Sequence, residues 1–234
     1  MAQQKHEIKV IRGIFFMIIS VTFFNLKDGL AKYLSTTYPI IELLFFQYIV
    51  MFVIILPVVV FRGGWHSIAT KHPYSLLLRG SIGVVAVGLL FAAVSKIPLA
   101  DAYAISFISP IVVTLLSPFL LGENVGVRRW IAVATGFGGV LLVIQPGFQE
   151  FHFGSILAIS AGVMFGLYGI ATRKLTQQEL PRIMMVYTSF VGIVGVSAFL
   201  PTIWVTPQLD HSVMILAMGV LATVGHALMI YSYA

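Results

Sequence analysis

The sequence predicts an all-α integral membrane protein, built as a bundle of two inverted five-helix repeats of which the second is truncated. Three observations lead to the membrane bundle, and an internal repeat described below leads to the two inverted halves. Hydrophobic residues make up 59% of the 234 residues and charged residues only 9%, whereas soluble domains average about 45–50% and about 25%. The apolar residues gather in runs long enough to cross a bilayer, and the basic residues lie on one side of those runs. The shortage of charge excludes an ordinary soluble protein.

Eight segments approach the roughly 20 residues that a helix needs to cross the hydrocarbon core. In chain order they are 13–34, 43–61, 76–95, 102–121, 130–144, 154–172, 184–205 and 213–233, of which the fifth is the shortest. Prolines mark the connections, since proline interrupts a helix; they are Pro39, Pro73, Pro98, Pro146, Pro181 and Pro207. No connection is long enough for a second, soluble domain.

The basic residues predict the orientation. With the N-terminus in the cytoplasm, the inner segments hold Lys5, Lys9, Arg12, Arg62, Lys71, Arg79, Arg128, Arg129, Arg173, Lys174 and Arg182. The outer connections then hold only Lys96. This asymmetry follows the positive-inside rule and indicates a cytoplasmic N-terminal tail at residues 1–12. The first apolar run is read as a span and not as a signal peptide, because it is long and no A-x-A-like cleavage site follows it.

An internal repeat is visible when 13–34 is aligned with 154–175. Identical pairs are Gly13 with Gly154, Ile18 with Ile159, Phe24 with Phe165, Leu26 with Leu167, and Leu34 with Leu175. The two segments run in opposite directions across the membrane, which is the arrangement of inverted-repeat transporters. We expect a first repeat at 13–147 and a second at 154–234. By the repeat logic the second repeat is short by two helices.

The stretch SFISPIVVTLLSPFLLGENVGVRRWIAVATGFGGVLLVIQPG, at 106–147, resembles the EamA-like domain of the drug/metabolite transporter superfamily. The resemblance lies in Pro110, in the Leu121-Gly122-Glu123 helix end, and in the glycine-rich helix that follows. DGLAKYL at 28–34 and SKIPLADAYAISFISP at 95–110 resemble the same family. The resemblance implies ten helices and transport of a small organic metabolite across a bacterial-type inner membrane. One departure is Gln47, near which many members carry an arginine.

The first span is unusual because it carries charges. Asn25, Asp28 and Lys32 lie within about 100° of one another on a helix and form one polar stripe. Asp28 precedes Lys32 by four residues, the favourable order for an ion pair, whereas Lys27 falls on another face. Intramembrane charges usually face a bundle interior or a wet cavity, so we expect the stripe to line a substrate cavity. The alternative is that Asp28 and Lys32 only neutralise each other and that Lys27 snorkels.

Further candidates for substrate binding or coupling are polar residues in other spans, namely Gln47, Tyr103, Ser106, Tyr168 and His226. Pro110 has no N–H, so it frees the carbonyl of Ser106 as an acceptor or simply kinks the helix. Tyr168 stands opposite Lys27 in the repeat alignment. His226 is the one histidine inside a predicted span, where it acts as a proton relay or as a packed neutral side chain. Gln47 contacts substrate or makes an interhelical hydrogen bond.

Several chemistries are not indicated. The absence of cysteine removes thiolate ligands and disulfides. Gly136, Gly138 and Gly139 lie in an apolar run and not in a nucleotide loop. We therefore expect no catalytic residues, no metal, no cofactor and no nucleic-acid partner, and a chain that is not an enzyme. The hypothesis is a secondary transporter that works by alternating access in the lipid bilayer. The alternatives are an inactive or scaffold fragment, which a homodimer would complete, and an intramembrane enzyme.

Overall fold

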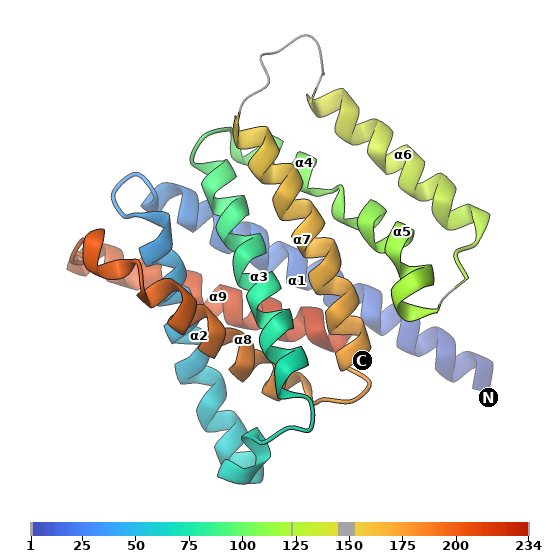
Figure 1. Ribbon diagram of the computed structural model, residues 1–234, viewed down its shortest axis with the longest axis horizontal. Coiled ribbons are helices and arrows are strands. Elements are labelled where there is room, and N and C mark those ends of the chain that lie inside the picture. Colours follow the sequence, from blue (N-terminus) through green and yellow to red (C-terminus); the bar gives the residue numbers. More distant parts are fainter. Residues whose placement is uncertain (1, 123, 145–152, 234) are drawn as a thin grey trace. The chain divides into compact units, whose positions relative to one another are not determined.

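The computed structural model describes residues 2–122, 124–144 and 153–233, with side chains from residue 11 onward except at 140, 143 and 144 (Figure 1). Within these residues every regular element is a helix. The elements are α1 (Ala2–Leu34), α2 (Ile40–Gly63), η1 (Trp65–Ile68), α3 (Pro73–Val94), α4 (Leu99–Ser106), α5 (Ser109–Leu121), α6 (Val127–Ile144), α7 (Phe153–Leu175), α8 (Pro181–Ser197), η2 (Leu200–Thr202) and α9 (Leu209–Tyr233). The prediction of an all-helical fold is confirmed.

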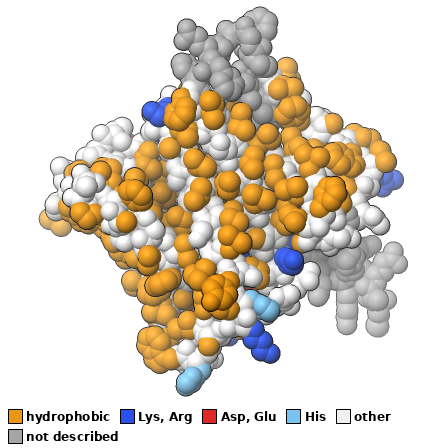
Figure 2. All heavy atoms as spheres, viewed as in Figure 1, with side chains coloured by type: hydrophobic (Ala, Val, Ile, Leu, Met, Phe, Trp, Pro, Cys, Tyr) orange, Lys and Arg blue, Asp and Glu red, His pale blue; other side chains and the backbone are white. Residues whose placement is uncertain are grey.

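Six segments of the described chain are long and apolar enough to cross a membrane. They are Ile11–Leu34, Ile40–Gly63, Pro73–Val94, Leu99–Leu121, Phe153–Leu175 and Leu209–Tyr233. A helix lies at each of the other two predicted segments, but α8 is only 17 residues long. The membrane bundle is therefore supported, whereas the count of eight spans stays a prediction. Many large hydrophobic side chains are exposed, among them Phe15, Val53 and Phe190, and Figure 2 shows hydrophobic side chains over much of the visible face.

Two predicted helices are broken or shortened, and proline is the reason in both. The segment 102–121 is divided into α4 and α5, because Pro110 cannot donate a hydrogen bond back to Ser106. The α-helix in segment 184–205 ends at Ser197, because Pro201 has no N–H to donate to the Ser197 carbonyl, and Leu200–Thr202 forms the short 3-10 helix η2. At the end of α5, Gly122 adopts φ of 67°, a left-handed helix cap that glycine accepts without strain. Glu123 of the Leu-Gly-Glu motif lies outside the described residues.

The chain forms two compact units. Unit 1 comprises residues 1–80 and 175–234, and unit 2 comprises residues 81–174. Unit 1 thus takes α1 and α2 from the first predicted repeat and α8 and α9 from the second. The repeats at 13–147 and 154–234 stay a prediction, and the boundary at 147 lies outside the described residues.

In unit 1, α1 packs along α9 (Figure 1), and α2 packs against α8 and α9. Glycines permit these close contacts. A Cβ atom added to Gly192 of α8 would overlap the Tyr48 ring, and one added to Gly219 of α9 would lie 2.5 Å from Cβ of Val50. Because glycine has no side chain, it lets helix backbones approach inside a membrane protein.

Unit 2 has its own apolar core between the end of α3, α4 and α7. Its fully packed members are Leu90, Ala93, Val94, Ile97, Ala102, Ile105, Ala158 and Ala161. Two glycines of α7 lie over the break between α4 and α5. A Cβ on Gly162 would lie 2.7 Å from the carbonyl oxygen of Ser106, and one on Gly166 would lie 2.7 Å from Cβ of Val112. The glycine spacing of four thus brings α7 directly onto the broken helix.

Candidate functional site in the interior of unit 1

The charged part of α1 is buried. Lys27 and Asp28 form an ion pair, and each side chain is only 3% exposed. Helical periodicity placed Lys27 on another face of the helix and paired Asp28 with Lys32. The structure instead pairs Asp28 with Lys27. Backbone directions of adjacent residues differ by about 100°, but the flexible four-carbon stem of a lysine lets its ammonium reach the neighbouring carboxylate. Lys32 lies in the last turn of α1 and is half-buried.

Arg79 is a buried charge that the sequence analysis placed on the cytoplasmic side. In the structure its side chain is fully buried in α3. Its Nη1 donates to Oγ1 of Thr188 at 2.8 Å and makes a weaker contact, at 3.5 Å, with the carbonyl oxygen of Met184. Thr188 in turn donates to the same carbonyl at 2.9 Å. The signal for this residue was present in the sequence, since position 79 lies inside the predicted span 76–95.

His226 of α9 is also buried, with 7% of its surface exposed. Its Nδ1 lies 2.9 Å from the carbonyl oxygen of Ala222. A carbonyl only accepts, so Nδ1 carries a proton in this contact. The Phe24 ring packs edge-on at 4.9 Å between centroids.

Gln47 is fully buried in α2, and neither atom of its side-chain amide has a hydrogen-bond partner in the described structure. Its neighbours on the helix fix its direction, since Tyr48 meets Gly192 of α8 and Val50 meets Gly219 of α9. Gln47 therefore points between α8 and α9. Unsatisfied buried amides are uncommon and costly, which makes this a candidate for a group that meets a polar ligand. Asn25, by contrast, is exposed and donates to the carbonyl of Val21 at 2.8 Å.

A second polar cluster joins two connections of unit 1. Glu42, fully buried at the start of α2, accepts the backbone N–H of Val205 at 3.0 Å. The hydroxyl of Tyr38 accepts the backbone N–H of Gln208 at 3.0 Å and lies 3.0 Å from Nδ1 of His211. Sequence reasoning missed these residues because they lie at span ends, where polar residues are common. Their contacts hold the α1–α2 connection to the segment before α9.

The three remaining candidates belong to unit 2. Tyr103 is half-buried, and its hydroxyl is enclosed without a hydrogen-bond partner in the described structure. Ser106 donates to the carbonyl of Tyr103 at 2.8 Å. Tyr168 is 4% exposed and packs on α3, where a Cβ on Gly83 would lie 2.7 Å from Cε2 of its ring. Tyr103 and Ser106 thus lie together in the turn before the helix break.

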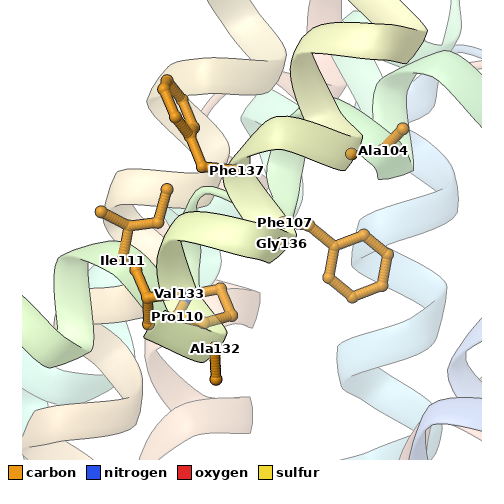
Figure 3. Close-up of a pocket in the computed structure, with 9 residues that line it drawn as sticks. Ala104, Phe107, Pro110, Ile111, Ala132, Val133, Gly136 and Phe137 are labelled. Atoms are coloured by element: carbon orange, nitrogen blue, oxygen red, sulfur yellow. The ribbon is translucent and has the colours of Figure 1, made fainter. Parts of the chain in front are cut away.

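Unit 2 also contains a cavity of about 390 Å³ beside that break. Its lining comes from α4, α5 and α6 and consists of Ala104, Phe107, Pro110, Ile111, Ala132, Val133, Gly136, Phe137 and Gly139. Figure 3 draws the lining residues as sticks, and the side chains that it shows contain only carbon. The cavity suits an apolar group and offers no charged side chain. Among the described residues no group of three His, Cys, Asp or Glu side chains is placed to hold a metal ion.

Comparison with known proteins identifies the chain's relatives. The model of the EamA-like transporter family matches residues 11–145. The S-adenosylmethionine uptake transporter of Rickettsia bellii is 26% identical over 207 residues, 88% of this chain and 71% of that protein. The riboflavin transporter of Vibrio cholerae is 29% identical over 180 residues, 76% of this chain and 60% of that protein. The pseudopaline exporter of Pseudomonas aeruginosa is 23% identical over 227 residues, 95% of this chain and 78% of that protein.

A solved crystal structure of another protein matches with a TM-score of 0.68 at 18% identity. It covers 97% of this chain and 78% of the other chain, which supports the helical fold alone. The relatives are named as transporters and not as enzymes. The resemblance seen in the sequence is confirmed, and so is the expectation that the chain is not an enzyme.

Proposed function

The chain belongs to the EamA-like transporter family, and from that premise we propose that it is a secondary transporter of a small organic metabolite. The observation that carries the proposal is the buried polar interior of unit 1, where Lys27, Asp28, Arg79, Gln47 and His226 lie within membrane-spanning helices. Ionisable residues are costly inside a bilayer and usually mark substrate or ion pathways. The relatives are named for different compounds, so we propose only the substrate class, a small metabolite, and not a particular compound.

The proposed mechanism is alternating access by two inverted repeats. In such transporters one repeat moves against the other around a site near the middle of the membrane. The buried Lys27–Asp28 pair suits this mechanism, because a pair that opens and closes can exchange partners with a substrate or a proton. Asp28, Gln47 and His226 are the proposed contacts in unit 1, with Asn25 and Lys32 at the ends of the polar stripe. Tyr103, Ser106 and Tyr168 are the proposed contacts in unit 2.

The proposed location is a bacterial-type inner membrane, with the N-terminus in the cytoplasm. The basic residues of the connections support this orientation. The proposed partners of the chain are the lipid bilayer and a small-molecule substrate. A homodimer is one proposed arrangement of the working transporter.

The test is flux in vesicles that contain only the purified chain. S-adenosylmethionine and riboflavin, labelled and loaded separately, serve as probes because relatives are named for them. We expect counterflow of at least one probe above that of protein-free vesicles. Well-folded protein that gives no flux of either probe, in either direction, would argue for the scaffold alternative.

A further inference from the structure

Glu42 is an acidic side chain enclosed in unit 1, and half of its carboxylate is unused. The residue is 0% exposed, and its Oε2 accepts the backbone N–H of Val205 at 3.0 Å. Its Oε1 has no hydrogen-bond partner in the described structure, and Glu42 takes part in no ion pair among the described residues. An ionised carboxylate is costly in an interior unless its oxygens are bonded and its charge is paired. Glu42 therefore lacks the contacts that would hold it permanently in the charged form.

The sequence at the start of α2 explains why one oxygen is left over. Glu42 is the third residue of α2, and at that position a glutamate commonly accepts the backbone N–H of the residue that caps the helix. The cap of α2 is Pro39, and proline has no N–H. The dipole at the helix start favours a negative charge, whereas enclosure favours a neutral group. Because these two effects oppose each other, both the charged and the protonated form of Glu42 are accessible.

The layer that covers Glu42 is thin. Val205, whose N–H meets the carboxylate, is 39% exposed, and Trp204 is 46% exposed. The Trp204 ring packs on the ring of Phe46, one helical turn after Glu42, with 5.6 Å between the centroids. Val205 and Trp204 belong to the segment 203–208, which joins η2 to α9. Solvent is therefore one layer of residues away from the carboxylate, and a small opening of this segment would let a proton reach it.

The other titratable side chains around α2 do not bond to the free oxygen of Glu42. On the same side of unit 1, the Tyr38 hydroxyl accepts the N–H of Gln208 and lies 3.0 Å from Nδ1 of His211. Asp210 is exposed in the first turn of α9. The remaining titratable side chains described for α1, α2, η1, α8 and α9 are Arg12, Lys27, Asp28, Lys32, Tyr33, Tyr48, Arg62, His66, Arg182, Tyr187, His226, Tyr231 and Tyr233. None of these described groups donates to Oε1, so this oxygen is available to a proton.

We propose that Glu42 is a proton-binding site of this transporter, loaded from the side of the membrane on which the segment 203–208 lies. A proton from water bonds to Oε1, and the carboxylate becomes a neutral acid. Oε2 keeps the Val205 N–H, but this hydrogen bond loses its charge and about half of its strength. The contact of Tyr38 with Gln208 then remains to hold the segment, so proton binding loosens the connection before α9. The inference rests on the proposed transport function, in which this loosening couples a proton to the movement of the helices.

The direct test follows the backbone amide of Val205 by NMR, on the purified chain in detergent with isotope-labelled valine. The Val205 resonance is identified as the one that Val205→Ile removes. We expect it to move in one step over a pH series from about 4 to about 9, the range in which glutamates titrate in proteins. In Glu42→Gln, whose amide oxygen still accepts the N–H, it should stay near its low-pH position throughout. A resonance that does not move in the original chain, or that moves equally in Glu42→Gln, would overturn the proposal.

Two neighbouring groups supply matched controls, because they lie close to Val205 in the chain and also titrate. Asp210→Asn removes an exposed carboxylate of α9, and His211→Gln removes the ring beside Tyr38. Both variants should keep the step at Val205. A step that disappears in one of them and survives in Glu42→Gln belongs to that neighbour and refutes the site. If Glu42→Gln does not fold, Glu42→Asp replaces it: the shorter carboxylate should shift and shrink the step, and an unchanged step would refute the site.

Hydrogen exchange tests the loosening. At one pH above the midpoint of the Val205 step, the amides of 203–208 should exchange about five- to tenfold faster in Glu42→Gln than in the original chain, because a bond to a charged acceptor is replaced by a bond to a neutral one. Equal exchange rates would refute the loosening.

Flux in vesicles tests the coupling, with riboflavin and S-adenosylmethionine as probes. An imposed pH difference should drive the flux of a transported probe in the original chain and not in Glu42→Gln. Flux that ignores the pH difference while the Val205 resonance titrates refutes the coupling and keeps the transporter. A titrating Val205 resonance without flux of either probe refutes the transporter and keeps the proton site.

Discussion

Replacing Asp28 by asparagine should lower the stability of the chain by several kcal/mol. The asparagine keeps the size of the side chain and removes its charge. In the structure the partner ammonium of Lys27 is 3% exposed, so water cannot take over the lost interaction. Removing one member of a buried pair costs about 3–5 kcal/mol because the other charge is left uncompensated. Lys71→Gln, at an exposed lysine, should change stability by less than about 0.5 kcal/mol.

The double variant Asp28→Asn, Lys27→Gln separates packing from transport. It removes both charges, so most of the lost stability should return, since replacing a whole buried pair is often neutral. Thermal unfolding in detergent reports stability, and flux in vesicles reports transport. If the pair takes part in transport, the double variant is stable but carries no substrate. A single variant as stable as the original chain would refute the buried pair, and a double variant with full flux would refute its role in transport.

Three further predictions concern packing and orientation. Gly192→Ala should destabilise the chain by about 1–3 kcal/mol, because the new methyl group overlaps the Tyr48 ring. Gly195→Ala, with open space around it, should be neutral or stabilising, and equal unfolding temperatures of the two variants would contradict the contact between Gly192 and Tyr48. Thr188→Val should cost about 1.5–3 kcal/mol because it removes an acceptor of Arg79. Ser189→Ala should cost less in the same thermal unfolding experiment, because the Ser189 hydroxyl donates to carbonyls of its own helix. Reporter fusions after Arg62 and Thr176 should read cytoplasmic and those near Tyr38 and Leu209 external, and a reversed pattern would refute the inverted repeat.

Apolar run length was enough to predict where helices lie, because a bilayer demands a minimum length of hydrophobic helix. Run length did not predict the break at Phe107 and Ile108 or the end of α8 at Ser197. The break and the helix end both depend on whether a proline kinks the helix or ends it. The side chains and backbone that pack beside the proline decide between these outcomes. Gly162, against the Ser106 carbonyl, is such a neighbour and lies far away in the sequence.

The role of the candidate site residues stays a prediction, but the sequence indicated where some of them lie. Apolar run length placed the charges of α1 and the amide of Gln47 within spans, and in the structure Lys27, Asp28 and Gln47 are buried. The periodicity of 100° per residue placed Lys27 on another face of the helix, because it describes only the direction in which a side chain leaves the backbone and not how far a long side chain reaches. Asn25, on the same predicted stripe as Asp28, is exposed and bonded to its own helix. A polar stripe on a single helix thus does not tell which of its members face the interior.

Arg79 shows most clearly why charge counting and structure give different answers. A basic residue two turns into a span either snorkels toward the cytoplasm or turns into the bundle, and both fit the positive-inside rule. Packing of the adjacent residue selects between them. Gly80 has no side chain, and a Cβ there would lie 3.3 Å from Cα of Thr188, so α8 approaches α3 closely at this level. That approach places the Thr188 hydroxyl within 2.8 Å of the guanidinium and encloses it. A small residue next to a basic residue near a span end therefore indicates that the basic side chain is buried. Here Gly80, and not Arg79 itself, gives that indication.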